Sequence, residues 1–190
     1  MESKELNYEI GVIHGRFQVL HNDHIKYLMA GKKLCKYMIV GITNPDPSLT
    51  RDSDANPHRS TPLANPLTYY ERYIMTQAAL LEQGLSLTEF SIVPFPINVP
   101  DLIKYYVPLD AIFFLTIYDK WGKQKKKYFQ SLGLKIHVLW EVPIEQKGLS
   151  SSDIRDLMRK SEKWEHLVPI SVAKLMKQWN IAKRLKEISS

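Results

Sequence analysis

The chain of 190 residues has only one cysteine, Cys35, and no long apolar run. A lone cysteine cannot form an internal disulfide, so a disulfide-stapled secreted fold is excluded and a reducing compartment is favoured. The longest nearly continuous apolar stretch, residues 111–117, is far shorter than the roughly 20 residues of a bilayer-spanning helix. Three glutamates among the first ten residues also disagree with a secretory signal. These absences predict a cytoplasmic protein with no membrane partner.

Charge is distributed unevenly along the chain. The formal net charge is +6, but residues 1–118 sum to −2 and residues 119–190 to +8. A basic half suits a polyanionic ligand, either a nucleic acid or a nucleotide. Because no helix–turn–helix, zinc-finger or RNA-binding signature is present, we expect no nucleic-acid partner.

Apolar runs alternate with helical patterns over most of the chain. This alternation predicts an α/β fold, a doubly wound parallel sheet of about five strands of the Rossmann-like type, with a C-terminal helical tail. We expect one domain over residues 1–190, with the sheet in 1–149 and the helical part in 150–190. The predicted strands are 8–14, 37–43, 90–96, 111–117 and 135–141, and the predicted helices are 22–35, 68–83 and 119–132.

The segment 44–66 interrupts this pattern, because it is polar, contains five prolines and shows no periodicity. An insert of this length inside a compact domain is either a functional flap or disordered. The sequence leaves both possibilities open.

Two segments have the chemistry of a phosphate site. The first strand ends at Gly15, where the backbone can approach a ligand closely, and His21 and His24 then stand at a predicted helix start. Ser150, Ser151, Ser152 and Arg155 follow the last strand and open another helix. Each segment alone has an ordinary explanation: two surface histidines in one case, a helix N-cap in the other. Together, at neighbouring strand ends, they predict a shared anion site.

The motifs G-R-F-Q-x-x-H-x-x-H and S-S-S-D-I-R resemble the H-x-G-H nucleotidyltransferase superfamily. The segment N-P-L-T-Y-Y-E-R at 65–72 is similar to a motif of archaeal-type nicotinamide-mononucleotide adenylyltransferases, as are D-K-W at 119–121 and W-E-H-L-V-P at 164–169. The resemblance covers almost the whole chain in order. It implies transfer of the adenylyl group of ATP to nicotinamide or nicotinate mononucleotide, with release of pyrophosphate and assembly into homo-oligomers.

The resemblance also implies roles for individual residues. Arg16, His21 and His24 would be catalytic. ATP would be bound by Gly15, Arg16, Phe17, Gln18, His21, His24, Ser150, Ser151, Ser152 and Arg155. The acceptor mononucleotide would lie against Asn98, Ile103, Tyr105, Tyr106 and Trp121. Mg²⁺ is the implied cofactor, held by phosphates and water without direct protein ligands.

Two departures from the family pattern concern the site. Asp23 replaces the glycine of H-x-G-H, where an anionic side chain would repel phosphate unless it points away. Ile103 takes the place of the tryptophan that stacks on the nicotinamide ring in the family. The transfer chemistry is therefore better supported than the acceptor. One alternative is an adenylyl- or cytidylyltransferase with another small phosphorylated acceptor, and a further one is a non-catalytic nucleotide sensor.

Overall fold

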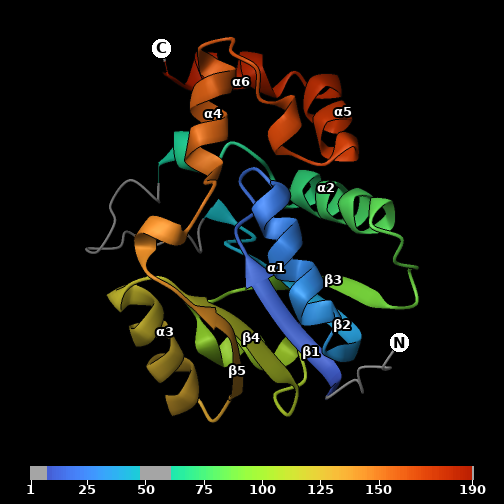
Figure 1. Ribbon diagram of the computed structural model, residues 1–190, viewed down its shortest axis with the longest axis vertical. Coiled ribbons are helices and arrows are strands. Elements are labelled where there is room, and N and C mark those ends of the chain that lie inside the picture. Colours follow the sequence, from blue (N-terminus) through green and yellow to red (C-terminus); the bar gives the residue numbers. More distant parts are fainter. Residues whose placement is uncertain (1–7, 48–60, 190) are drawn as a thin grey trace.

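A computed structural model describes residues 8–47 and 61–189 (Figure 1). Its centre is one five-stranded sheet in which every neighbouring pair of strands is parallel. The strand order is β3-β2-β1-β4-β5. The prediction of a doubly wound parallel sheet of five strands is confirmed. The strands are β1 Tyr8–Gly15, β2 Cys35–Thr43, β3 Phe90–Phe95, β4 Ile112–Ile117 and β5 Lys135–Glu141.

Helices cover both faces of this sheet. Helices α1 (Asn22–Lys32) and α2 (Tyr69–Glu82) pack on one face, through an apolar cluster that includes Ile13, Leu28 and Met75. Helix α3 (Lys120–Ser131) packs on the other face through Phe129. Because both faces are covered, the strands carry continuous apolar runs instead of an alternating pattern.

The strand order reverses between β1 and β4. The chain builds from β1 outward to β3 and then returns to the other side of β1, where β4 pairs with it. In doubly wound sheets, ligands bind in the crevice at the carboxyl ends of the strands beside such a reversal. The segment that leaves β1 at Gly15 therefore begins at the expected ligand position.

Local sequence signals located some helix ends and missed others. The T-x-x-E motif predicts a capping box at α2, and Thr68 Oγ1 indeed accepts the backbone N–H of Glu71, whose carboxylate accepts that of Thr68. The prediction that the first helix runs to Cys35 was wrong. Helix α1 ends at Lys32, and Cys35 begins β2, because it pairs with Tyr8 of β1 in the sheet.

The predicted C-terminal helical part is confirmed. Helices α4 (Ser151–Arg159), α5 (Ile170–Gln178) and α6 (Ile181–Ser189) lie at the end of the molecule toward which β1 points (Figure 1). Arg184 of α6 forms a bidentate ion pair with Glu71 of α2, with N–O distances of 2.7 and 2.8 Å. Short 3-10 helices fill several connections: η3 Pro62–Ala64, η4 Pro100–Tyr105, η5 Ile144–Gln146 and η6 Glu165–Leu167.

Two further sequence predictions concern the insert at 44–66 and membrane-spanning helices. Most of the predicted insert 44–66 lies outside the described residues, so its role stays open. Among the residues that the structure describes, no helix combines the length and the apolarity that crossing a bilayer would demand.

Candidate phosphate site at the carboxyl end of the sheet

The turn after β1 is tightly packed. A Cβ atom on Gly15 would lie 2.7 Å from the ring of Phe17, so only glycine fits there without a shift. Phe17 itself has a φ of +51°, in the left-handed region that costs free energy for a residue with a side chain. Its buried ring meets the edge of the His24 imidazole at a centroid distance of 5.1 Å. The turn thus holds the start of α1 close to the strand end.

His21 and His24, which we call the imidazole pair, cap the start of α1. Each Nδ1 accepts the backbone N–H of the other residue at 3.4 Å, and the two rings stack with centroids 3.7 Å apart. A neutral imidazole whose Nδ1 accepts a hydrogen bond carries its proton on Nε2. Both rings therefore carry their proton on Nε2 at a helix N-terminus, an arrangement that suits a phosphate, and the His24 ring is also hydrogen-bonded to the backbone of Val19.

The charge state of the imidazole pair depends on its surroundings. Burial lowers the pKa of His21 to about 4, and the nearby Lys147 ammonium adds to this effect. Burial also places the pKa of His24 well below its ordinary value, with further lowering by the charges of His21 and Arg16. Both rings are therefore neutral hydrogen-bond donors near pH 7. A bound polyanion would raise both pKa values and strengthen their interaction with its phosphates.

The second predicted segment lies directly against the first. The Ser151 hydroxyl donates to the carbonyl oxygen of Val19 at 2.9 Å, and the Arg155 guanidinium donates to that of Gln18. The backbone N–H of Leu149 donates to Asp23 at 2.8 Å. Residues 18–24 and 149–155 therefore meet in space, as the two motifs predicted, and the N-termini of α1 and α4 share one end of the sheet.

Several side chains expected to bind ATP already have protein partners. Arg155 is 6% exposed and also donates to the Ser152 hydroxyl at 3.0 Å. Ser150 accepts the backbone N–H of Asp153 as the N-cap of α4. The Gln18 amide exchanges two hydrogen bonds of 2.9 Å with the backbone of Leu67. These contacts order the walls of the site, and the predicted phosphate contacts of these residues stay predictions.

The buried Arg72 side chain holds together the backbone segments next to the site, a role that the sequence patterns did not indicate. Its side chain is 2% exposed and donates to the carbonyl oxygens of Arg16 at 3.0 Å and of Thr43 and Asn44 at 2.7 Å. It thereby ties the turn after β1 to the end of β2. The only signal in the sequence was its place in the N-P-L-T-x-x-E-R motif, which does not reveal those acceptors.

The residues predicted to bind the acceptor do not share one environment. Ile103 is 2% exposed and belongs to the apolar cluster under α3, so its side chain is core in this structure. Trp121 is 42% exposed, with the Lys125 ammonium 4.9 Å from its ring centroid. Asn98, Tyr105 and Tyr106 are exposed. Four of the five thus lie at the surface, and their binding role stays a prediction.

His14, the residue before Gly15, is a further distinctive group that the sequence patterns did not indicate. It is 6% exposed, and neither of its ring nitrogens has a hydrogen-bond partner among the described residues. Its ring stacks on Phe95 at 4.9 Å and lies 5.2 Å from Phe129. Burial, followed by the charge of Lys125, places its pKa well below the ordinary 6.5. The folded chain therefore holds His14 neutral.

This burial predicts sensitivity to acid. In the unfolded chain a histidine takes up a proton near pH 6.5, whereas His14 in the folded chain resists protonation, so stability is lost as the pH falls below 6.5. Each such histidine contributes a slope of up to about 1.4 kcal/mol per pH unit. Urea unfolding between pH 7.5 and 5 should show this loss of stability. In His14→Leu, the free energy of unfolding should change less with pH, by the contribution of one histidine. An unchanged slope in His14→Leu, matching that of the exposed-histidine variant His166→Ala, would contradict the assignment.

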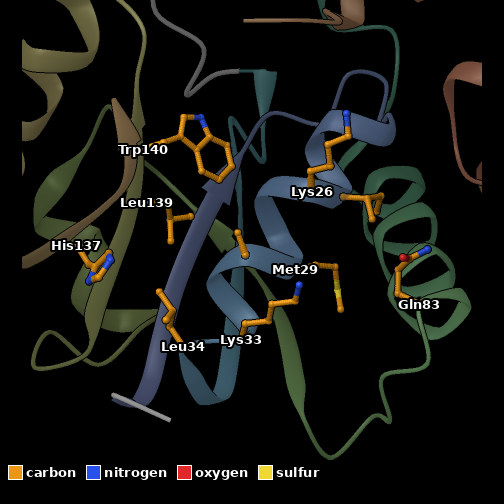
Figure 2. Close-up of a pocket in the computed structure, with 10 residues that line it drawn as sticks. Lys26, Met29, Lys33, Leu34, Gln83, His137, Leu139 and Trp140 are labelled. Carbon is orange, nitrogen blue, oxygen red and sulfur yellow. The ribbon is translucent and has the colours of Figure 1, made fainter. Parts of the chain in front are cut away.

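A separate hollow of about 520 Å³ lies between α1 and β5. Figure 2 shows Lys26 and Met29 of α1 and the following Lys33 on one side of it and Leu139 and Trp140 of β5 on the other. None of the residues predicted to bind phosphate lines this hollow. The candidate site is therefore the junction of residues 18–24 with 149–155.

Comparisons with known proteins found one family model and several relatives that match most of this chain. A family model described as cytidylyltransferase-like matches residues 12–157. The phosphonoformate cytidylyltransferase of Streptomyces viridochromogenes is 44% identical over 93% of this chain and 95% of its own length. The nicotinamide-nucleotide adenylyltransferase of Thermococcus onnurineus is 31% identical over 95% of this chain and 88% of its own.

A solved structure has the same fold at low sequence identity. The bifunctional NMN adenylyltransferase/ADP ribose pyrophosphatase of Francisella tularensis, complexed with AMP and a manganese ion, superposes with a TM-score of 0.67 at 14% identity. The match covers 95% of this chain and 52% of that one, so this chain spans about half of its length. The likeness supports the Rossmann-like nucleotidyltransferase fold.

Proposed function

Because this chain belongs to the cytidylyltransferase-like family, we propose that it transfers the cytidylyl group of CTP to a small phosphonate acceptor of the phosphonoformate type. Pyrophosphate is the second product. The junction of residues 18–24 with 149–155 supports the transfer chemistry. The observation that carries the choice of nucleotide and acceptor is the 44% identity to a phosphonoformate cytidylyltransferase over nearly the full length of both chains.

The reaction is a displacement at phosphorus. An oxygen of the acceptor phosphonate forms a bond to the α-phosphorus of CTP, the bond to the α–β bridging oxygen breaks, and pyrophosphate leaves with that electron pair. Such a transfer depends on in-line positioning and on stabilising the charge that develops on the leaving group. In this proposal, the rings of the imidazole pair, the Arg16 guanidinium and the N-terminus of α1 supply that stabilisation; the reciprocal cap of His21 and His24 at the start of α1 supports their role.

The carboxylates nearest the site have protein partners. Asp23 accepts the N–H of Leu149, and Asp153 accepts that of Ser150. The donors that remain are imidazoles, hydroxyls and a guanidinium, which suit phosphate better than a hard cation. Mg²⁺, when bound, would be held by triphosphate oxygens and water and would neutralise phosphate charge.

Adenylyl transfer to nicotinamide mononucleotide is the second candidate. It is favoured by the 31% identity to the Thermococcus onnurineus adenylyltransferase and by the motif at 65–72. The core position of Ile103 is less favourable to it, because no tryptophan is available there to stack on a nicotinamide ring. The third alternative, a sensor without activity, drew its support from Asp23. The hydrogen bond from Leu149 gives this carboxylate a structural role, which weakens the argument for a decayed site.

A substrate panel tests the proposal. Purified protein with Mg²⁺ is incubated with CTP or ATP, each combined with phosphonoformate, nicotinamide mononucleotide or nicotinate mononucleotide, and pyrophosphate release is followed. We expect kcat/KM for CTP with phosphonoformate to exceed every other pair by at least about tenfold, the discrimination that a few specific contacts supply. A preference for ATP with a mononucleotide would favour the second candidate, and no pyrophosphate from any pair would refute both.

A further inference from the structure

Asp23 occupies the position where the H-x-G-H motif has glycine, between the two members of the imidazole pair. Its side chain reaches the segment that precedes α4: Oδ2 accepts the backbone N–H of Leu149 at 2.8 Å. Oδ1 lies 2.6 Å from the Lys26 ammonium. The Leu149 contact joins residues 126 positions apart in the chain. It is thus a direct link between the two halves of the candidate phosphate site.

Gly148 fits the Asp23 carboxylate closely. Its φ is +58°, a conformation that favours glycine. A Cβ atom at this position would also lie only 2.5 Å from Asp23 Oδ2, a distance that real Cβ contacts do not show. The positive φ and the closeness of the carboxylate therefore both favour glycine at this position, and a larger residue would have to displace Asp23. The Asp23 side chain and the Gly148 backbone form a matched pair.

The charge of Asp23 is compensated where it lies. Burial raises the pKa of Asp23, but the hydrogen bonds from Lys26 and Leu149 lower it by more. The pKa is therefore below its ordinary value. The carboxylate is therefore ionised at neutral pH. Because one oxygen faces an ammonium and the other a backbone N–H, its repulsion of a nearby phosphate is reduced.

The contact also fixes the residues on either side of Gly148 and Leu149. Leu149 stands immediately before Ser150, the N-cap of α4. The next residue, Ser151, donates a hydrogen bond to the Val19 carbonyl. Lys147 stands on the other side of Gly148, and its charge acts on both rings of the imidazole pair. Holding the backbone at residues 148–149 thus fixes the start of α4 beside the segment that carries the imidazoles.

We propose that Asp23 is a positioning residue, which through Gly148 and Leu149 holds the start of α4 against residues 18–24, the segment that carries the imidazole pair. This inference rests on the proposed nucleotidyl transfer, in which the junction binds the triphosphate. In place of the close backbone approach that a glycine permits, this chain uses the carboxylate to order the opposite wall of the site. The gain is preorganisation, which lowers the entropy lost when the nucleotide binds.

Three single variants separate geometry from charge. Asp23→Gly removes the acceptor of the Leu149 N–H and should raise KM for CTP about tenfold, as expected for one hydrogen bond to a charged group, while kcat changes less than about threefold. Asp23→Asn keeps an oxygen for Leu149 and should stay within about threefold of the unmodified protein in both constants. Lys26→Ala removes the exposed ion pair but keeps the Leu149 contact, so both constants should stay within about threefold of those of the unmodified protein.

A double-mutant cycle tests the matched pair. Gly148→Ala should raise KM in the unmodified background, because its methyl group meets Asp23 Oδ2. In the Asp23→Gly background the same change should have a smaller effect, since the carboxylate is gone, so the two effects should not multiply. Multiplying effects, an Asp23→Gly variant with unchanged KM, or an Asp23→Asn variant as poor as Asp23→Gly would each overturn the proposal.

A readout that needs no substrate separates this inference from the proposed function. Amide hydrogen exchange in the nucleotide-free protein should show Leu149 protected, with at least about tenfold faster exchange in Asp23→Gly and no change in Lys26→Ala. Equal exchange of Leu149 in all three proteins would refute the positioning role, whatever the activity. Faster exchange in Asp23→Gly in a protein that turns over no substrate pair would refute the proposed function and still support the contact.

Discussion

Replacing His24 by alanine is expected to lower kcat by about 10²–10³-fold with little change in the folded structure. In the proposed mechanism the variant removes one of the two rings that stabilise the charge that develops during transfer, and that charge exists mainly in the transition state. His24 is partly exposed at the third position of α1, where alanine is well tolerated, so the helix should persist. Pyrophosphate release with the substrate pair that the panel identifies measures kcat, and thermal unfolding checks the fold.

A matched histidine variant controls for general effects of such a change. His166 is exposed in η6, and its backbone carbonyl, which alanine keeps, accepts from the Asn22 side chain at 3.1 Å. His166→Ala should therefore keep full activity. If His24→Ala retained activity within about threefold of the unmodified protein, the imidazole pair would not be part of the catalytic machinery.

The largest loss of stability is expected for Arg72→Ala. This buried guanidinium donates to backbone carbonyls at the ends of β1 and β2 and to that of Thr68, 3.2 Å away, at the start of α2. Burial lowers its pKa to about 10, so it remains charged at neutral pH. Its removal leaves buried carbonyls without donors, which should lower the free energy of unfolding by about 3–5 kcal/mol. The corresponding fall in Tm is on the order of 10 °C for a chain of this length.

Urea and thermal unfolding measure this effect, and two variants define its cause. Arg72→Lys should recover less than about half of the loss, because one ammonium cannot reach carbonyls that lie in different directions. Arg159→Ala serves as the control, since Arg159 makes a 3.3 Å ion pair with Asp156 on the surface of α4 and should change stability by less than about 0.5 kcal/mol. A loss below about 1 kcal/mol in Arg72→Ala would show that the carbonyls find other donors.

Local patterns predicted the site best where the interacting residues are close in the chain. The Thr68–Glu71 capping box spans three residues, and so does the reciprocal cap of His21 and His24, which makes both accessible to sequence reasoning. The meeting of the two phosphate segments was predicted because parallel strands place their carboxyl ends on one edge. The end of α1 was misplaced, because Cys35 suits a helix as well as a buried strand until its pairing with Tyr8 is known.

Periodicity, caps and turns were enough to establish the α/β order, the parallel sheet and the position of the two phosphate segments at helix starts. These signals involve neighbours within a few residues, so they can be read along the chain. Three other features emerged only from the packed molecule: the Asp23 carboxylate accepts the Leu149 N–H, Arg72 joins the turn after β1 to the end of β2, and His14 lies against aromatic rings with no hydrogen-bond partner among the described residues. Each of these depends on strand order and packing across many residues, and the hydrogen-bond partner of a buried polar group exists only once those distant segments have met.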